Sequence, residues 1–301
     1  MNVSVIIPVF NRAQMLKRAV SSVLEQSYQD FELIVVDDGS TDDLSEIQKT
    51  VESSGHRFLS LAQNSGVAAA RNCALTTATG TWIALLDSDD CWLPNKLLQQ
   101  IEYHSAHPQY LLSQCEERWF RNEKLFNPRR RHLMPVGDAF SKSLELCCIS
   151  SSSVLIHSSI YQELGFYDER MRVCEDYDLW LRVTNKYAIG LVPGPLVEKY
   201  GGHPDQLSKS TAALDKFRLY SLLKLVLTEN LSAVRMRESL SWIAKRAEIL
   251  EKGASKRNDS LSLLYCSIFD TSRLYLSNAE MQFKELQASL EPLFQKLIPN
   301  L

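Results

Sequence analysis

The sequence lacks most of the features that mark a secreted, zinc-binding or membrane-spanning protein. Its seven cysteines form no CxxC pair and have no zinc-ligand spacing, so we expect free thiols of a reducing compartment, mostly buried because their neighbours are apolar. No stretch approaches the roughly 18 uncharged apolar residues that span a bilayer. The first residues carry no basic signal-peptide segment. We therefore expect a cytoplasmic protein, with peripheral contact at the inner face of the membrane left open.

Two further absences narrow the function. The formal net charge is only −3 over 301 residues, which gives no general attraction to nucleic acid, and no nucleic-acid partner is expected. No GxGxxG segment follows an early apolar run, which argues against an NAD-dependent enzyme.

Continuous apolar runs alternate with helical periodicity in the first third of the chain. The runs predict strands over residues 3–9, 31–36, 58–61 and 82–86. Helices are expected between them, one starting at Ser40 or Thr41 and another over 67–77, and a further helix over 95–106 follows the last of these strands. Strands without polar alternation are typical of a parallel sheet covered by helices on both faces. The sequence therefore predicts an α/β fold.

The rest of the chain changes character twice. From about 110 to 200 the pattern is mixed, with strands expected over 154–157 and 188–192 and a helix over 177–185. A basic segment that we expect to be a loop lies between residue 110 and the strand over 154–157. It includes Arg118, Arg121, Lys124 and Arg129 to Arg131. This loop is either solvated or meets an anionic acceptor.

After about 210 the chain is Leu-rich and has no glycine until Gly253, which predicts a helical extension. We expect a catalytic domain over 1–209, with a donor-binding half of about 1–107 and an acceptor half of about 108–209, and the extension over 210–301. The extension packs on the core, forms a homodimer or lies on a membrane surface.

Acidic clusters follow two of the predicted strands, at the edge where open α/β sheets bind ligands. Asp87, Asp89 and Asp90 come directly after the 82–86 strand, and carboxylates two residues apart can share one hard cation such as Mg²⁺ or Mn²⁺. Asp37 and Asp38 end the 31–36 strand and could accept hydrogen bonds from a base or ribose. Each cluster taken alone is equally compatible with a solvated turn.

A third acidic cluster and a late histidine are open in the same way. Glu175 and Asp176 begin the helix predicted near 177, where acidic residues commonly cap, although a general base is the functional alternative. His203 lies in a Gly-rich segment and is either an exposed loop residue or a metal ligand.

Taken together and in this order, these segments resemble glycosyltransferase family 2, whose members have the GT-A fold. The resemblance covers roughly residues 3–205 and rests on five signatures: Val5 to Arg12, Ile34 to Asp42, Asn64 to Gly66 with Ala70 to Asn72, Leu85 to Asp90, and Glu175 to Trp180. It implies a GT-A, Rossmann-like, mostly parallel sheet flanked by helices. It also implies an inverting transfer of a sugar from a nucleotide-diphosphate donor, UDP-sugar favoured, to a glycan or lipid-linked glycan of bacterial surface polysaccharide.

The resemblance also assigns roles position by position. Asp176 would be the catalytic base, Asp89 would hold Mn²⁺ or Mg²⁺, and His203 would be a further metal ligand. Glu175 and Trp180 would lie on the acceptor side. The donor would contact a larger set: Pro8, Phe10, Asn11, Asp38, Asn64, Arg71, Asp87 and Ser88.

Two other functions stay open at this stage. A non-catalytic sugar-nucleotide binder would share the donor site but would lack the base at Asp176. A nucleotidyltransferase would also combine an acidic metal site with a nucleotide-binding sheet, but it would need a glycine-rich basic loop after the first strand, where Phe10, Asn11 and Arg12 stand instead.

Overall fold

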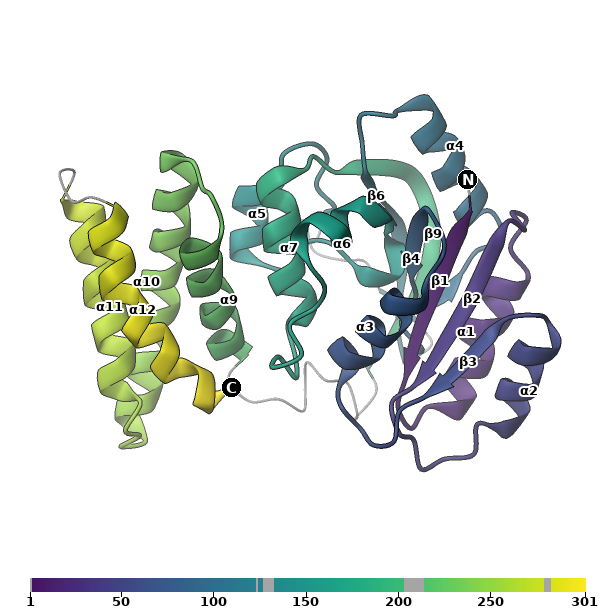
Figure 1. The fold of residues 1–301 in the computed structure, drawn as a ribbon, viewed down its shortest axis with the longest axis horizontal. Helices are drawn as coiled ribbons and strands as arrows, with labels where there is room; N and C mark the ends of the chain where they lie inside the picture. Colours follow the sequence, from purple (N-terminus) through teal and green to yellow (C-terminus); the bar gives the residue numbers. More distant parts are fainter. Residues whose placement is uncertain (1, 123, 127–132, 203–213, 279–282) are drawn as a thin grey trace. The chain divides into compact units, whose positions relative to one another are not determined.

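A computed structural model describes residues 2–122, 124–126, 133–202, 214–278 and 283–301 (Figure 1). The chain divides into two compact units. Unit 1 consists of Met1–Ala139, Cys148–Glu169 and Lys186–Gln206, and unit 2 consists of Phe140–Cys147, Arg170–Asn185 and Leu207–Leu301. The division into a catalytic domain over 1–209 and an extension over 210–301 stays a prediction.

The described part of unit 1 contains a nine-stranded mixed sheet with the order β3-β2-β1-β4-β8-β6-β9-β5, and β7 pairs with β6. The strands are β1 Val3–Val9, β2 Phe31–Asp37, β3 Arg57–Ser60, β4 Trp82–Leu85, β5 Cys91–Trp92, β6 Leu112–Arg121, β7 Lys124–Phe126, β8 Leu155–His157 and β9 Gly190–Gly201. The helices of this unit are α1 Ala13–Leu24, α2 Ser45–Ser53, α3 Val67–Thr77, α4 Lys96–Ala106, α6 Ser158–Leu164 and the short 3-10 turn η2 Ser151–Ser153.

The first four strands to be predicted form the parallel half of this sheet. β1 pairs in parallel with both β2 and β4, and β2 with β3. The chain moves outward from β1 to β3 and then returns to β4, so right-handed crossovers put α1 and α2 on one face and α3 on the other (Figure 1). The strand order reverses between β1 and β4, and the carboxyl ends of these two strands flank the crevice where such sheets bind ligands.

The other half of the sheet is less regular than the sequence indicates. β8 is antiparallel to β4 and β6, whereas β9 runs parallel to β6 and extends to Gly201, well beyond the expected residue 192. Helix α4 packs on β6 and β9 through buried side chains that include Leu97 and Ile101. Unit 1 is therefore an α/β structure with a mixed rather than wholly parallel sheet.

The prediction of a basic loop after residue 110 is wrong for its described part. Arg118 and Arg121 lie in β6, and Lys124 begins β7, with Arg121 and Lys124 paired in register. Asn122 has a φ of 49°, which a tight hairpin turn requires and which asparagine tolerates. Arg129 to Arg131 lie outside the described residues.

Helix α2 begins at Ser45 rather than at Ser40 or Thr41. The polar side chains that precede it are used by the loop after β1: the Ser40 hydroxyl accepts from the Asn11 amide (2.9 Å), and Asn11 Oδ1 accepts from the Thr41 amide (2.7 Å). The Asp42 carboxylate accepts from the Ala13 amide at the start of α1 (2.8 Å). Because these groups join two loops, the helix begins only after them.

Unit 2 is helical. It contains α5 Phe140–Glu145, α7 Glu175–Lys186 except for its last residue, α9 Leu214–Thr228, α10 Ala233–Lys256, α11 Ser262–Ser277 and α12 Phe283–Leu297. The helices share one apolar core, in which Leu181, Tyr220, Leu240 and Leu290 are fully or almost fully buried. The Leu-rich sequence after 210 is explained by this core. Among the described residues, none of the helices combines the length and the apolar character needed to cross a bilayer.

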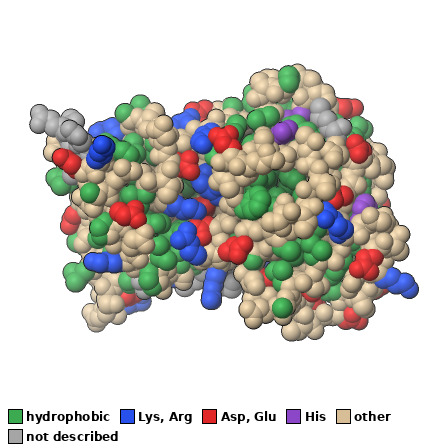
Figure 2. Space-filling model, in the orientation of Figure 1, with side chains coloured by type: hydrophobic (Ala, Val, Ile, Leu, Met, Phe, Trp, Pro, Cys, Tyr) green, Lys and Arg blue, Asp and Glu red, His purple; other side chains and the backbone are tan. Residues whose placement is uncertain are grey.

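The seven cysteines are all free thiols, but the expectation that most are buried is wrong. Only Cys91 and Cys115 are buried, four others are half-buried, and Cys266 is exposed. On the face drawn in Figure 2, acidic and basic side chains are interspersed, in keeping with a net charge near zero.

Candidate active site

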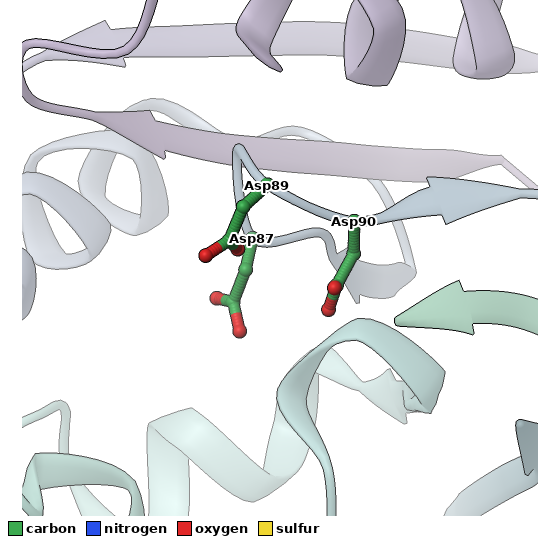
Figure 3. Close-up of side chains that lie close together, drawn as sticks. All are labelled: Asp87, Asp89 and Asp90. Atoms are coloured by element: carbon green, nitrogen blue, oxygen red, sulfur yellow. The ribbon is translucent and has the colours of Figure 1, made fainter. Parts of the chain in front are cut away.

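Three carboxylates gather at the carboxyl end of β4, on the loop that the sequence singles out. Asp87, Asp89 and Asp90 each offer an oxygen within 4.8 Å of the others'. Figure 3 shows the Asp87 and Asp89 side chains next to one another, with the Asp90 carboxylate lying closer to the short 3-10 turn below. Oxygen donors at this spacing are the ligands that Mg²⁺ and Mn²⁺ prefer.

The loop is held from below by Ser152, a fully buried residue of η2. Its hydroxyl donates to Asp90 Oδ2 (2.6 Å) and accepts from the Asp87 amide (3.1 Å). The backbone carbonyl of Ser152 in turn accepts from the Trp92 indole (2.8 Å). Ser152 therefore fixes both ends of the acidic loop to the rigid sheet.

Asp90 is the most buried of the three carboxylates. Besides the Ser152 hydroxyl, it accepts from the Tyr200 amide (3.1 Å), and the Lys199 ammonium lies 4.0 Å from Oδ2. Burial raises the pKa of Asp90 to about 8, with the charge of Lys199 opposing this and the charges of Asp89 and Asp87 adding to it. This carboxylate ties the loop to strand β9.

Two arginines offset the negative charge of the other two carboxylates. Arg12, which follows β1, donates to Asp89 Oδ2 (2.8 Å), and Arg71 of α3 donates to Asp87 Oδ1 (2.8 Å). Burial, and then the charge of Asp87, raise the pKa of Asp89, against the pull of Arg12 and Lys199. Sequence reasoning missed Arg12, Lys199 and Ser152, because each meets the cluster only through the pairing of strands that are distant along the chain.

The residue types fit a divalent cation. Burial and the charge of Asp87 raise the pKa of Asp89 although Arg12 and Lys199 oppose this, so these basic groups do not fully stabilise its charged form. A divalent cation on Asp87 and Asp89 would stabilise both carboxylates, with oxygen ligands of the right kind.

Asp38 lies at the carboxyl end of β2 and braces a second loop of the same sheet edge. It is buried, and its two oxygens accept from the amides of Ser65 (2.7 Å) and Gly66 (2.9 Å). Burial raises the pKa of Asp38 even though both amides favour the charged form. Gly39 lies against this loop with a φ of 73°, and a Cβ there would stand 2.5 Å from the backbone of Gln63.

The other residues assigned to the donor lie along this edge of unit 1. Pro8 is buried near the end of β1, and Phe10 is 41% exposed just beyond it. Asn11 is exposed and joins the loop after β1 to the loop after β2. Asn64 is exposed beside the amides that Asp38 accepts from. Ser88 is buried within the acidic loop itself.

The residues assigned to the base and the acceptor side belong to unit 2. Asp176 lies in the first turn of α7, where its Oδ1 accepts from the Tyr177 amide (2.7 Å) and its Oδ2 accepts from the Cys147 thiol (3.3 Å). Glu175 and Trp180 are buried in the same helix, at 6% and 1% exposed. Their roles stay predictions. His203 lies outside the described residues.

Unit 1 thus has a parallel half-sheet with reversed strand order at β1 and β4, and an acidic cluster where that order reverses, which is the arrangement of a GT-A fold. The sequence matches the family described as "Glycosyl transferase family 2" over residues 4–165, more than half of the chain. The chain belongs to that family.

Individual relatives agree with this assignment. The Escherichia coli protein named UDP-Glc:alpha-D-GlcNAc-diphosphoundecaprenol beta-1,3-glucosyltransferase WfgD is 32% identical over 222 residues, 72% of this chain and 81% of that protein. An uncharacterized glycosyltransferase of Rickettsia felis is 32% identical over 194 residues, but the match spans 62% of this chain and 31% of that protein. The chain thus spans about a third of the length of such longer relatives.

The fold also has a solved counterpart. The crystal structure of S. aureus TarS 1-349 in complex with UDP-GlcNAc superimposes with a TM-score of 0.68 at 16% identity, covering 100% of this chain and 91% of that chain. At this identity the likeness shows the fold.

Proposed function

We propose that this protein is an inverting glycosyltransferase that depends on a divalent cation. It transfers a sugar from a nucleotide-diphosphate donor, UDP-sugar favoured, to a hydroxyl of a glycan or lipid-linked glycan in bacterial surface polysaccharide synthesis. The observation that carries the proposal is the cluster of Asp87, Asp89 and Asp90 at the point where the strand order reverses. The names of WfgD and of the TarS complex supply the chemistry of a UDP-sugar donor, and WfgD that of a lipid-diphosphate acceptor.

Asp89, with Asp87, would hold Mn²⁺ or Mg²⁺, and the cation would neutralise the negative charge that collects on the leaving diphosphate. Arg12 and Arg71 would help to neutralise the charge of the diphosphate, since both guanidinium groups lie beside these carboxylates. The buried Ser152 and Asp90 keep the loop rigid, so little reorganisation is needed when the donor binds. Asp38 fixes the loop that frames the nucleotide base.

Asp176 acts as the general base in this proposal. It removes the proton of the acceptor hydroxyl as that oxygen attacks the anomeric carbon from the face opposite the diphosphate, which inverts the configuration in one displacement. Such assistance contributes about 10² to 10⁴ in rate. The Cys147 thiol and the Tyr177 amide, which both donate to Asp176, orient its carboxylate.

A panel of sugar nucleotides, assayed for Mn²⁺-dependent hydrolysis and thermal stabilisation, tests the proposal. We expect at least one nucleoside diphosphate sugar to stabilise the protein only when the cation is present. Asp89→Asn should lose that stabilisation, whereas Asp176→Asn should keep it and lose transfer. If Asp176→Asn turned over normally, the assignment of the base would be wrong.

A further inference from the structure

The β6–β7 hairpin has two faces of different composition. Residues in register on neighbouring strands share a face, and alternate residues along a strand share one as well. The register pairs Trp119 with Phe126 and Arg121 with Lys124, so these four side chains lie on one face. Arg118, Phe120 and Leu125 lie on the other.

The first of these faces is continuous with the acidic loop. Lys199 of β9 is in register with Trp119, so it shares that face. Its ammonium lies 4.0 Å from Asp90 Oδ2 and 4.0 Å from Glu117 Oε1. The Trp119 indole donates to the same Glu117 carboxylate (2.7 Å). The side chains on this face therefore form a row that begins at the cation cluster and continues along the hairpin.

The order of the row is an aromatic pair followed by a basic pair. Next to Lys199 come Trp119 and Phe126, of which Phe126 is 41% exposed. Beyond them, at the tip, come Arg121 and Lys124, both exposed. The residue in register with Arg121 on β9 is Gly201, which has no side chain to cover it.

Each pair has a ligand chemistry that suits it. Aromatic rings offer an apolar face, which fits the apolar C–H face of a sugar ring. At the tip, the arginine guanidinium can donate two hydrogen bonds to phosphate oxygens, and the lysine ammonium offers a compact positive charge to them. Residues 118 to 126 of the sequence include three basic residues and one acidic residue, whereas the whole chain has a net charge of −3. The hairpin is thus locally basic on a slightly acidic protein.

We propose that this face of the hairpin binds an acceptor whose sugar is joined to a diphosphate. The sugar lies on Trp119 and Phe126, which brings its hydroxyls toward the cation cluster, and the diphosphate lies farther out against Arg121 and Lys124. This inference rests on the proposed function and specifies its acceptor side. A diphosphate on a lipid and a diphosphate on a soluble sugar share the recognised chemistry.

The test compares binding of three probes: N-acetylglucosamine diphosphate carrying a prenyl chain, the same sugar diphosphate without the chain, and the prenyl glycoside without phosphate. The double variant Arg121→Ala with Lys124→Ala should weaken binding of both diphosphate probes by about tenfold or more, and leave the glycoside unchanged. Phe126→Ala should weaken all three probes. A loss confined to the prenyl probes would instead make the lipid the recognised group and overturn the proposal.

The opposite face supplies matched controls. Arg118→Ala removes a basic side chain, and Leu125→Ala an apolar one that is 64% exposed, from the same hairpin, and both should bind the probes as the unmodified protein does. Equal losses from both faces would show a general effect on the hairpin and would contradict the inference. Mn²⁺-dependent donor hydrolysis by water, which needs no acceptor site, should be unchanged in every variant. If the unmodified protein lacks that hydrolysis for every donor, the proposed function fails separately.

Discussion

Removal of one buried hydroxyl should loosen the whole acidic loop. Ser152 is fully buried, and in Ser152→Ala the Asp90 carboxylate loses a 2.6 Å donor while the Asp87 amide loses its 3.1 Å acceptor. A buried polar group left unsatisfied costs about 1–3 kcal/mol. Because two such groups are affected and Asp87 is partly open to water, we expect the free energy of unfolding to fall by about 2–4 kcal/mol. Half-maximal donor stabilisation should also require at least about tenfold more Mn²⁺.

The assay is urea unfolding followed by circular dichroism, together with a Mn²⁺ titration of thermal stability in the presence of a sugar nucleotide. Ser153→Ala is the matched control, since the Ser153 side chain is in the same turn, is also fully buried, and donates only to the local carbonyl of Ser150 (2.9 Å). The control should lose about 1 kcal/mol and keep its Mn²⁺ dependence. If both variants behaved alike, Ser152 would have no special part in supporting the loop.

Three further outcomes follow from the geometry. Arg12→Met removes the guanidinium that contacts Asp89 Oδ2, so calorimetry should show tighter binding of Mn²⁺. Weaker binding would refute a competition between Mn²⁺ and the Arg12 guanidinium for this oxygen. Gly39→Ala should lower the free energy of unfolding by more than about 2 kcal/mol in urea, because the added Cβ would stand 2.5 Å from the Gln63 backbone at a φ of 73°. An unchanged unfolding midpoint would mean that the loop adjusts freely. Burial, and then the charges of nearby histidines, lower the pKa of His104 to about 4. Because the pKa of histidine in the unfolded chain is about 6.5, the stability that neutral His104 contributes is fully present above that pH and is lost as the pH falls toward 4. The loss amounts to about 2 kcal/mol at pH 5. Unfolding of His104→Gln should accordingly depend less on pH between 7.5 and 5, and an equal dependence would contradict this origin.

Strands β1, β2 and β4 of the parallel half could be predicted from the sequence because they are largely buried on both faces. β1 and β2 are continuous apolar runs, and their bounds agree with the expected ones to within a residue. β5 was not expected, since two residues carry no periodicity and Cys91 and Trp92 form a strand only by pairing with β9. The sequence predicts a loop where the β6–β7 hairpin lies, because its interspersed basic residues carry no apolar periodicity.

The part of the candidate site whose residues are adjacent in sequence could be predicted, and the part that strand pairing brings together could not. The carboxylates of the acidic loop are adjacent in sequence, and a cation site is a natural inference from them. Arg12 and Ser152 contact that loop from 77 and 65 residues away along the chain. Their hydroxyl and guanidinium groups have no local motif, so only the sheet order, with β1 and β8 on either side of β4, brings them there.

Calorimetry of UDP binding with and without Mn²⁺ shows whether the acidic loop after β4 holds a cation that binds the nucleotide. We expect the unmodified protein to bind UDP far more tightly with the cation. Asp89→Asn should lose this gain, whereas Asp43→Asn, a change at another acidic residue of unit 1, should keep it. Mn²⁺-dependent binding that survived in Asp89→Asn would contradict the assignment of the acidic loop as the cation site.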